Sequence, residues 1–443
     1  MKSVENRETL VRSPDHETVL DSLLAGIEAS DPAQVIEAAV TVDGGTLRID
    51  GEAYDLSEYD EVVVLGGGNA ASQVARALEK KLGEYLDGGI VVTDDPVETE
   101  RVTVLPGDHP VPSELGVEST RQLLDRARET DADTLVLGVI TGGGSALMAA
   151  PAFGIELEEL IETTDQLLRS GAPIQDINAV RKHLSALKGG QLAALAAPAT
   201  TVSLVLSDVV GNHLDVIASG PFVPDPTTFA DARAVIERFD LSLPDSIEDR
   251  IESGVAGDLE ETPKPGDPVF DRVTTHIVAD GMTALEAAAD VISDAGYEPL
   301  VLSSRVEGEA SEAAKTHAAI ANEIRATGTP IDPPAAILTG GETTVTVDGG
   351  GSGGPNQEFA LSAGLAIEGS TIVGAVDSDG IDGASDAAGA LVDESAIDRP
   401  AAQAALDAND SGAYLAEQDR LIVTGQTGTN VNDIRVLLVP EPT

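Results

Sequence analysis

The sequence contains no cysteine, and this absence excludes disulfide bonds, thiol catalysis and zinc sites with cysteine ligands. Tryptophan is also absent, and aromatic residues make up only 2% of the chain. No run of about 18 apolar residues occurs, so we expect no membrane-spanning segment. The first 30 residues lack the apolar core of a signal peptide. We therefore expect a soluble, cytoplasmic protein.

Basic side chains are scarce. The 443 residues include 26 basic and 77 acidic ones, which gives a formal net charge of −51. We expect binding neither to nucleic acid nor to an anionic membrane, because both require clusters of Lys and Arg. Near molar salt the screening length falls to roughly 3 Å, which relieves the self-repulsion of such a chain. The composition is typical of a cytoplasmic protein from a salt-accumulating halophile; an unusually acidic protein from a moderate environment is the alternative.

Hydrophobic residues nevertheless make up 42% of the chain, enough to form a core. Short apolar runs bounded by Gly or Asp predict buried strands. They lie at residues 62–65, 90–93, 134–140, 202–206, 275–279, 299–303, 336–339, 343–347, 371–376 and 421–424. Residues 72–82, 119–129 and 283–294 have helical spacing. Alternating strands and helices predict an α/β fold with a mostly parallel, doubly wound sheet.

Proline-rich segments indicate how the chain is divided. Residues 243–268 are polar and show no strong core pattern, and residues 328–334 contain three prolines. Proline clusters end helices and mark connections. We place the main boundary near residue 330, which predicts a domain of residues 1–330 and a smaller one of residues 331–443.

Two glycine-rich loops follow predicted strands. Residues 66–71 read GGGNAA, so that Gly66, Gly68 and Ala71 match a dinucleotide-binding pattern, although a structural tight turn is an equal alternative. Residues 141–147 read TGGGSAL and predict a second anion-binding turn. Close packing of a helix on a strand is the alternative for this loop.

A basic cluster occupies residues 181–188 and contains Arg181, Lys182, His183 and Lys188. Asn178, three residues before Arg181, falls on the same face of the expected helix. We interpret the cluster as a clamp for a small carboxylate or phosphate. Surface charges paired with nearby acids are the alternative.

Acidic residues follow other predicted strands. Asp208 ends one strand, where it would hold Mg²⁺, accept a proton or simply cap the next turn. Polar loops at residues 349–358, 377–386 and 424–433 follow strands near the C-terminus. Converging on one cleft, these loops would suit a nucleotide, Mg²⁺ and a small acid; ordinary solvated turns are the alternative for each of them.

Together these motifs resemble the glycerate 2-kinase family, the type with a C-terminal MOFRL domain. The resemblance rests on GAPIQDINAVRKHLSALKGGQLA at 171–193, SDVVGNHLDVIASGPFVPDPTTFADA at 207–232, GDHPVPSELG at 107–116, TGGGSALM at 141–148, DSDGIDGASDAAGALVD at 377–393 and TGQTGTNVNDIRV at 424–436. It implies ATP-dependent phosphorylation of D-glycerate at its 2-hydroxyl, with a Rossmann-like N-terminal domain and the active site in the cleft between the domains. Some relatives are labelled hydroxypyruvate reductase, so an NAD(P)H-dependent reductase is the alternative.

Motifs and resemblance together predict the site residues. The catalytic set is Asp208, Arg181, Lys188, Asn69 and Pro355. The set for nucleotide and phosphate is Gly66, Gly67, Gly68, Gly142, Gly143, Gly144, Ser145, Gly353, Gly354, Asn356, Thr429 and Asn430. Arg181, Asn178 and Ser145 are predicted to bind the substrate, and Asp208, Asp379 and Asp382 to bind Mg²⁺. The implied partners are a hydroxy acid and a nucleotide, and the choice between monomer and homodimer stays open.

The sequence departs from the family pattern at three positions. Asn69 stands where the family has a lysine, Pro355 where it has an arginine, and Asn212 where it has an aspartate. Lost cations weaken the stabilisation of phosphoryl charge, and one lost contact costs about 10²–10³ in rate. An active kinase, a weakened paralogue acting on another hydroxy acid, and a non-catalytic binding protein are therefore three alternatives.

Overall fold

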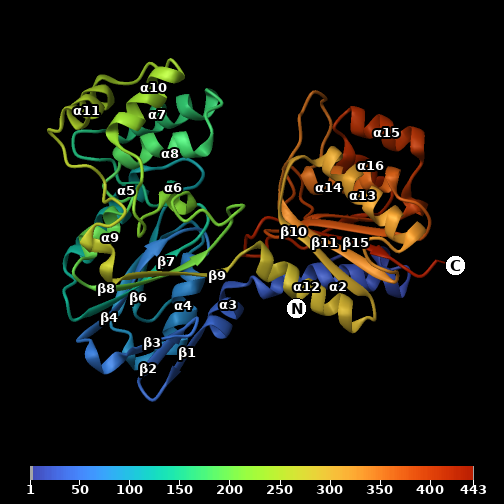
Figure 1. Cartoon of the computed structure of the whole chain (residues 1–443), viewed down its shortest axis with the longest axis horizontal. Coiled ribbons are helices and arrows are strands. Elements are labelled where there is room, and N and C mark those ends of the chain that lie inside the picture. The colour runs from blue at the N-terminus through green and yellow to red at the C-terminus, as the bar shows by residue number, and fades with distance from the viewer. Residues whose placement is uncertain (1–2, 443) are drawn as a thin grey trace. The chain divides into compact units, whose positions relative to one another are not determined.

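The computed structural model describes residues 3–442 and contains two compact units. Residues 35–278 form one, which we call the central unit. The terminal unit combines the N-terminal segment up to residue 34 with the chain from residue 279 onward. Figure 1 shows the elements of each unit.

The central unit is built on a six-stranded sheet in the order β6-β5-β4-β7-β8-β9. The pairs β6–β5, β5–β4, β4–β7 and β7–β8 are all parallel. The sheet strands are β4 (Glu61–Gly67), β5 (Gly88–Thr93), β6 (Val102–Pro106), β7 (Thr134–Ile140), β8 (Thr200–Leu206) and β9 (Val273–Ala279). The chain order reverses between β4 and β7, so the prediction of a doubly wound α/β fold is confirmed.

Helices cover this sheet and also form a cap with its own core. The helices are α3 (Pro32–Ala39), α4 (Ala71–Leu82), α5 (Glu114–Arg128), α6 (Gly144–Leu147), α7 (Leu157–Arg169), α8 (Ile174–His183), α9 (Gln191–Ala196), α10 (Phe229–Arg238) and α11 (Asp245–Ala256). Helices α7, α8, α10 and α11 gather at one end around Leu160, Val180, Phe229 and Ile247 (Figure 1). At the other end lies a small antiparallel sheet of β1 (Val40–Asp43), β2 (Thr46–Ile49) and β3 (Glu52–Asp55).

The terminal unit contains a mixed sheet in the order β10-β11-β15-β12-β13-β14. Only its β10–β11 pair is parallel. Its strands are β10 (Glu298–Glu309), β11 (Ala335–Thr344), β12 (Ile372–Asp377), β13 (Gly389–Val392), β14 (Leu421–Ile422) and β15 (Asp433–Val439). Its helices are α1 (Arg7–Leu10), α2 (Pro14–Ala29), α12 (Gly281–Asp294), α13 (Ala310–Thr327), α14 (Pro355–Ala366), α15 (Arg399–Asp407) and α16 (Ser411–Glu417).

The N-terminal helix α2 belongs to this C-terminal sheet. It packs beside α12, and Leu20, Leu23 and Ile27 join a core with Leu285 and Ile434 (Figure 1). Ser13 caps the helix by accepting a hydrogen bond from the His16 amide, and proline follows at the first helical position. The helix can therefore bury a complete apolar face against residues more than 250 positions away in the chain.

The division into compact units differs from the boundary expected near residue 330. The proline-rich segment there is only the turn between α13 and β11. Strand β10 lies before that turn but pairs in parallel with β11 after it, which keeps residues 279–330 in the terminal unit. A proline cluster reports a break in local structure, whereas a compact unit is set by strand pairing and packing.

Most predicted strands are present, with two local differences. The runs 336–339 and 343–347 form the single strand β11, which ends at Thr344. The polar stretch 243–268 contains the helix α11, whose Ile247 and Ile251 are buried. A sparse apolar stripe suffices there because only one face of α11 packs on the cap.

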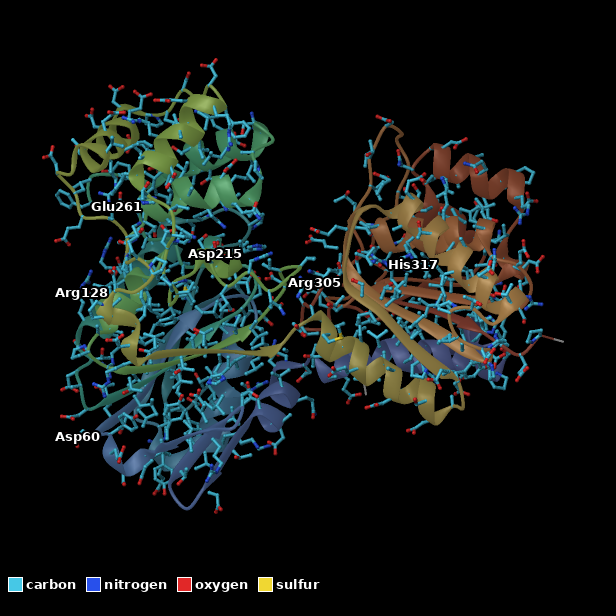
Figure 2. All side chains as sticks on the ribbon, viewed as in Figure 1. Asp60, Arg128, Asp215, Glu261, Arg305 and His317 are labelled. Atoms are coloured by element: carbon cyan, nitrogen blue, oxygen red, sulfur yellow. The ribbon has the colours of Figure 1, made fainter. Side chains whose placement is uncertain are left out.

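Carboxylates project outward around both units, as at the exposed Asp60 (Figure 2). Between residues 3 and 442, no helix combines the length and the apolar character that crossing a bilayer requires.

Replacing Gly66 by alanine tests how closely β4 and β7 approach. Gly66 has φ +154°, and a Cβ there would lie 1.9 Å from the carbonyl oxygen of Val139. We expect Gly66→Ala to lower the free energy of unfolding by about 2–6 kcal/mol, from backbone strain and overpacking. Urea unfolding in molar KCl measures this.

The control is Gly88→Ala, because a Cβ at Gly88 would lie 3.4 Å from the carbonyl oxygen of Arg101, an ordinary contact. Equal stabilities of the two variants would contradict the close-approach argument.

Candidate functional site

The loops after β4 and β7 lie side by side at the point where the sheet order reverses. Ligands of doubly wound sheets bind at this point, outside the carboxyl ends of the strands. A Cβ on Gly68 would lie 2.1 Å from the Thr141 hydroxyl oxygen, so the first loop needs glycine for packing. The amide of Gly68 donates to Val92 O at 3.0 Å and that of Asn69 to Gly142 O at 2.8 Å. The tight-turn alternative therefore accounts for the glycines of the first loop, including Gly67, which packs against Met148.

The second loop keeps hydrogen-bond donors available. Gly143 has φ +74°, in the left-handed region that favours glycine. Within residues 3–442, no hydrogen bond engages the amide N–H groups of Gly142 and Gly143, and both residues are partly exposed. Gly144 and Ser145 follow as the start of α6. Successive unused amides in such a turn suit an anion.

The side chain of Asn69 forms hydrogen bonds with a neighbouring carboxylate. Its Nδ2 donates to both carboxylate oxygens of Asp94, each at 2.9 Å. Its Oδ1 lies against Gly143, where a Cβ would be 2.0 Å away. The position at which the family resemblance implies a lysine is thus an amide bound to a carboxylate.

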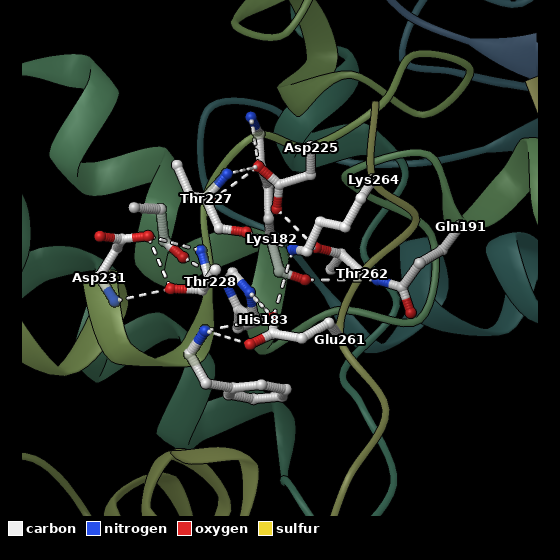
Figure 3. Close-up of polar contacts among 12 residues, drawn as sticks. Lys182, His183, Gln191, Asp225, Thr227, Thr228, Asp231, Glu261, Thr262 and Lys264 are labelled. Atoms are coloured by element: carbon white, nitrogen blue, oxygen red, sulfur yellow. Dashed lines mark hydrogen bonds and ion pairs between the residues drawn. The ribbon is translucent and has the colours of Figure 1, made fainter. Parts of the chain in front are cut away.

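The basic cluster divides into two pairs of side chains. Lys182 is 1% exposed and lies 3.3 Å from Asp225 and 3.4 Å from Asp215. His183 contacts the Glu261 carboxylate through Nε2 at 3.1 Å and Ala179 O through Nδ1 at 2.7 Å. Figure 3 shows the Lys182–Asp225 and His183–Glu261 contacts, which hold α8 in the cap. Lys182 and His183 are therefore structural, as the surface-pairing alternative for the cluster proposed, although they are buried.

Arg181 and Lys188, in contrast, have no carboxylate partner within residues 3–442. Lys188 is buried, and its Nζ donates to Ser145 O at 2.7 Å. Burial and, to a smaller extent, the charge of Arg181 together lower the pKa of Lys188 to about 7. Burial also lowers the pKa of Arg181. Two desolvated cations side by side form a strong site for an anion.

A chain of polar side chains continues from these cations. The Ser145 and Ser219 hydroxyl oxygens lie 2.8 Å apart, and Ser219 donates to Asn178 Oδ1 at 3.0 Å. Asn178 is buried, and its Nδ2 has no hydrogen-bond partner among the residues that the structure describes. Leaving such a donor unpaired is costly unless a ligand accepts its hydrogen bond. Ser219, with φ +60°, was not among the predicted residues, although the quoted motif ASGP contains it.

Asp208 lies where β8 ends, beside the loop after β7. A Cβ on Gly142 would be 2.2 Å from Asp208 Oδ2, so only glycine allows this carboxylate so close to the loop. Burial raises the pKa of Asp208, while the charge of His109 opposes the rise. A carboxylate with a raised pKa is better suited to accept a proton.

In the terminal unit, Asp382 caps the helix that follows the predicted phosphate loop. It is fully buried and accepts hydrogen bonds from the Asn356 amide at 2.9 Å and the Gln357 amide at 2.8 Å. Burial raises its pKa to about 6. Pro355 occupies the first helical position, which suits its fixed φ and missing N–H. A carboxylate of the chain itself thus engages the amide of Asn356, a residue that was predicted to bind nucleotide or phosphate, together with the amide of Gln357.

The remaining predicted residues lie in the loops after β12 and before β15. Asp379 Oδ1 accepts from the Ile381 amide at 2.7 Å, and burial raises the pKa of Asp379. Thr429 donates to Ser30 O at 2.5 Å, and Asn430 Oδ1 accepts from the Asn432 amide at 2.9 Å. Across residues 3–442, no three acidic or histidine side chains form a ready metal site.

The structure therefore brings together Asn69, Gly142–Ser145, Asn178, Arg181, Lys188 and Asp208 in the central unit. The predicted residues from Gly353 to Asn430 belong to the terminal unit. That both sets face one cleft stays a prediction.

Comparison with known proteins identifies relatives along nearly the whole chain. The family described as "Domain of unknown function (DUF4147)" matches residues 18–252, and the MOFRL family matches residues 335–433. A glycerate 2-kinase from Pyrococcus horikoshii is 40% identical over 93% of this chain and 94% of its own. A putative hydroxypyruvate reductase from Agrobacterium vitis is 42% identical over 85% of this chain and 87% of its own. The crystal structure of a glycerate kinase from Thermotoga maritima, 35% identical, matches with a TM-score of 0.84 over 96% of this chain and 99% of its own.

The buried Lys188 makes stability depend on pH in a defined direction. With a pKa of about 7 in the folded state and about 10.4 in the unfolded state, the unfolded state binds more protons between these values. Below pH 7 Lys188 is charged in the folded state, and the full free-energy cost of burying that charge destabilises the fold. As pH rises above 7 the buried amine loses its proton, and this cost disappears. Relative to Lys188→Met, the wild-type free energy of unfolding should increase by at most about 1.4 kcal/mol per pH unit from pH 7 to 10.

Urea unfolding of both proteins at pH 6 to 10 measures the difference. The control variant is Lys80→Met, because Lys80 is exposed in the same unit. A difference between wild type and Lys188→Met that does not change with pH would show that Lys188 stays protonated in the folded state.

Proposed function

Because the chain belongs to the glycerate 2-kinase family of DUF4147 and MOFRL proteins, we propose how its own residues carry out that reaction. Relatives at 38–40% identity are named glycerate 2-kinase or D-glycerate 2-kinase. The chain is an ATP-dependent kinase that phosphorylates glycerate. Its reactants are therefore anions that must bind to a protein of net charge −51.

Arg181 and Lys188 bind the carboxylate of glycerate in this proposal. The observation that carries it is that both cations are desolvated and lack a carboxylate partner in the described chain. Asn178 Nδ2, unpaired in the same place, donates a further hydrogen bond. Charged hydrogen bonds of this kind are the strong ones, and together they fix the position of a small acid.

Phosphoryl transfer takes place beside this carboxylate site. The amides of Gly142 and Gly143 donate to oxygens of the transferred phosphoryl group, and Asp208 accepts the proton of the 2-hydroxyl. The hydroxyl oxygen forms a bond to the γ-phosphorus as the bond from that phosphorus to the ADP oxygen breaks. The transition state is loose, so positioning and charge contribute more than base strength.

Mg²⁺ bound with ATP would neutralise phosphate charge. Among the predicted ligands Asp379 fits this role best, because burial and the nearby charge of Asp433 raise its pKa, and a cation would relieve both effects. Asp382 already serves two amides of α14. Mg²⁺ commonly binds one or two carboxylates together with substrate phosphates, which is compatible with one protein carboxylate.

Substituting Arg181 tests the carboxylate site. We expect Arg181→Ala to raise the KM for D-glycerate and to lower kcat/KM by about 10²–10³, while the KM for ATP stays the same. Turnover is measured with ATP and D-glycerate in molar KCl, and NMR identifies the phosphorylated oxygen.

The control is Arg128→Ala, an exposed arginine paired with Asp125. An unchanged KM for glycerate in Arg181→Ala would contradict the assignment. Steady NADH oxidation with hydroxypyruvate would instead support the reductase, the name given to the Agrobacterium vitis relative.

Restoring the lysine of the family pattern tests the Asn69 position. A lysine at residue 69 would meet Asp94, which now accepts two hydrogen bonds from Asn69. We expect Asn69→Lys alone to change kcat little, and Asn69→Lys/Asp94→Asn to raise it by about tenfold or more, since one such cation contributes about 10²–10³.

Asp94→Asn alone is the matched control, measured in the same turnover assay. If the single and double variants have equal rates, Asp94 does not neutralise a cation at this position.

A further inference from the structure

We propose that the buried Lys182–Asp225 ion pair is a positioning device that sets the affinity for glycerate by aiming Arg181 and Lys188 at the substrate. The inference rests on the proposed carboxylate site and adds residues that do not touch the substrate themselves. Lys182 and Asp225 belong to the network in Figure 3.

The pair is buried and unusually well supported. Lys182 is 1% exposed and Asp225 0% exposed, with 3.3 Å between Nζ and Oδ1. Asp225 also accepts from the Thr227 amide at 3.0 Å, from the Thr227 hydroxyl at 2.7 Å and from the Thr262 hydroxyl at 2.8 Å. Burying two charges is expensive, and an apolar pair is often as stable, so such pairs are better explained by the geometry that they fix.

On α8 the pair determines which way Arg181 faces. Successive residues of a helix project about 100° apart, because there are 3.6 residues per turn. With Lys182 held toward Asp225, Arg181 projects from a different face, the one that it shares with Asn178 three residues earlier. The direction of Arg181 is therefore tied to the contact made by its neighbour.

The pair also contacts the turn that carries Lys188. A Cβ on Gly189 would lie 3.2 Å from both Asp225 Oδ2 and Lys182 Cβ, and the Gly189 amide donates to Ser219 O at 2.9 Å. Gln191 Nε2 donates to the carbonyls of Lys182 at 3.3 Å, Ser185 at 2.7 Å and Lys188 at 2.9 Å. A shift of Asp225 would thus move the backbone of Lys188 and of Ser219 together.

Charge gives a second reason for the pair. Asp215 and Asp225 both lie within reach of the last turn of α8, and Lys182 engages both of them. Without Lys182, these carboxylates would attract Arg181, one residue away. Lys182 therefore keeps Arg181 available for an anionic substrate in a chain with 77 acidic residues.

The test neutralises the pair while keeping its size. In Lys182→Met/Asp225→Asn both buried charges are removed, and the new side-chain amide retains an oxygen that accepts from Thr227. Asp215 also loses its contact with Lys182, but its side chain is 38% exposed and stays solvated. We expect the KM for D-glycerate to rise and kcat/KM to fall by about 10–100-fold, because displacements near 1 Å have effects of this size. The KM for ATP and the midpoint of urea unfolding should stay close to wild type.

The matched control is Arg126→Met/Glu61→Gln, which removes a partly buried ion pair of the same unit with 2.5 Å between its charged atoms. An unchanged KM for glycerate in Lys182→Met/Asp225→Asn would overturn the proposal. Equal rises in the KM for glycerate and the KM for ATP, together with lower stability, would also overturn it.

If Lys182→Met/Asp225→Asn does not fold, Thr262→Val is the second variant, because it removes one hydrogen bond to Asp225 and keeps both charges. A selective rise in the KM for glycerate then supports the proposal, and no rise contradicts it.

Arg181→Ala separates this inference from the function on which it rests. If Arg181→Ala leaves the KM for glycerate unchanged, the carboxylate site itself is wrong. If Arg181→Ala raises it and the pair variants do not, only the positioning role fails.

Discussion

The proposed carboxylate site depends on keeping positive charge unpaired inside a strongly acidic chain. Arg181 and Lys188 can attract a substrate anion only if none of the 77 carboxylates reaches them first. The fold achieves this by desolvating both groups and by directing nearby acids elsewhere: Lys182 binds Asp215 and Asp225, and Glu261 contacts His183. Burial weakens the charged form of Lys188, and a bound anion would restore it.

Backbone amide donors, like the cations, are paired with a carboxylate at one place and left unpaired at another. At the start of α14, the carboxylate of Asp382 satisfies the amides of Asn356 and Gln357, so this helix end is neutralised within the protein. At Gly142 and Gly143, no described residue fills that role. Two glycine-rich loops with similar sequences thus differ in what their amides can bind, and only the packing around each loop separates them.

Local pattern predicted much of the architecture. Strand β7 has the predicted bounds, β4 and α4 lie within two residues of theirs, and the alternation of strands and helices indicated the doubly wound sheet. The pattern could not place α2, because an amphipathic helix shows that it has an apolar face but not which surface covers that face. In the structure, Leu20, Leu23 and Ile27 pack in one core with residues of α12 and β15, which lie far along the chain.

The sequence by itself determined the family from its motifs and the α/β class from its periodicity. It also identified the few basic residues, because composition and position alone show them. It also predicted that Asn178 and Arg181 share a helix and that Asp208 follows a strand, as the structure shows. Only the tertiary structure decided that Lys182 and His183 contact carboxylates, that Asp382 caps a helix and that Asn69 meets Asp94. These outcomes depend on which distant carboxylate approaches each side chain, and the folded chain alone fixes such distances.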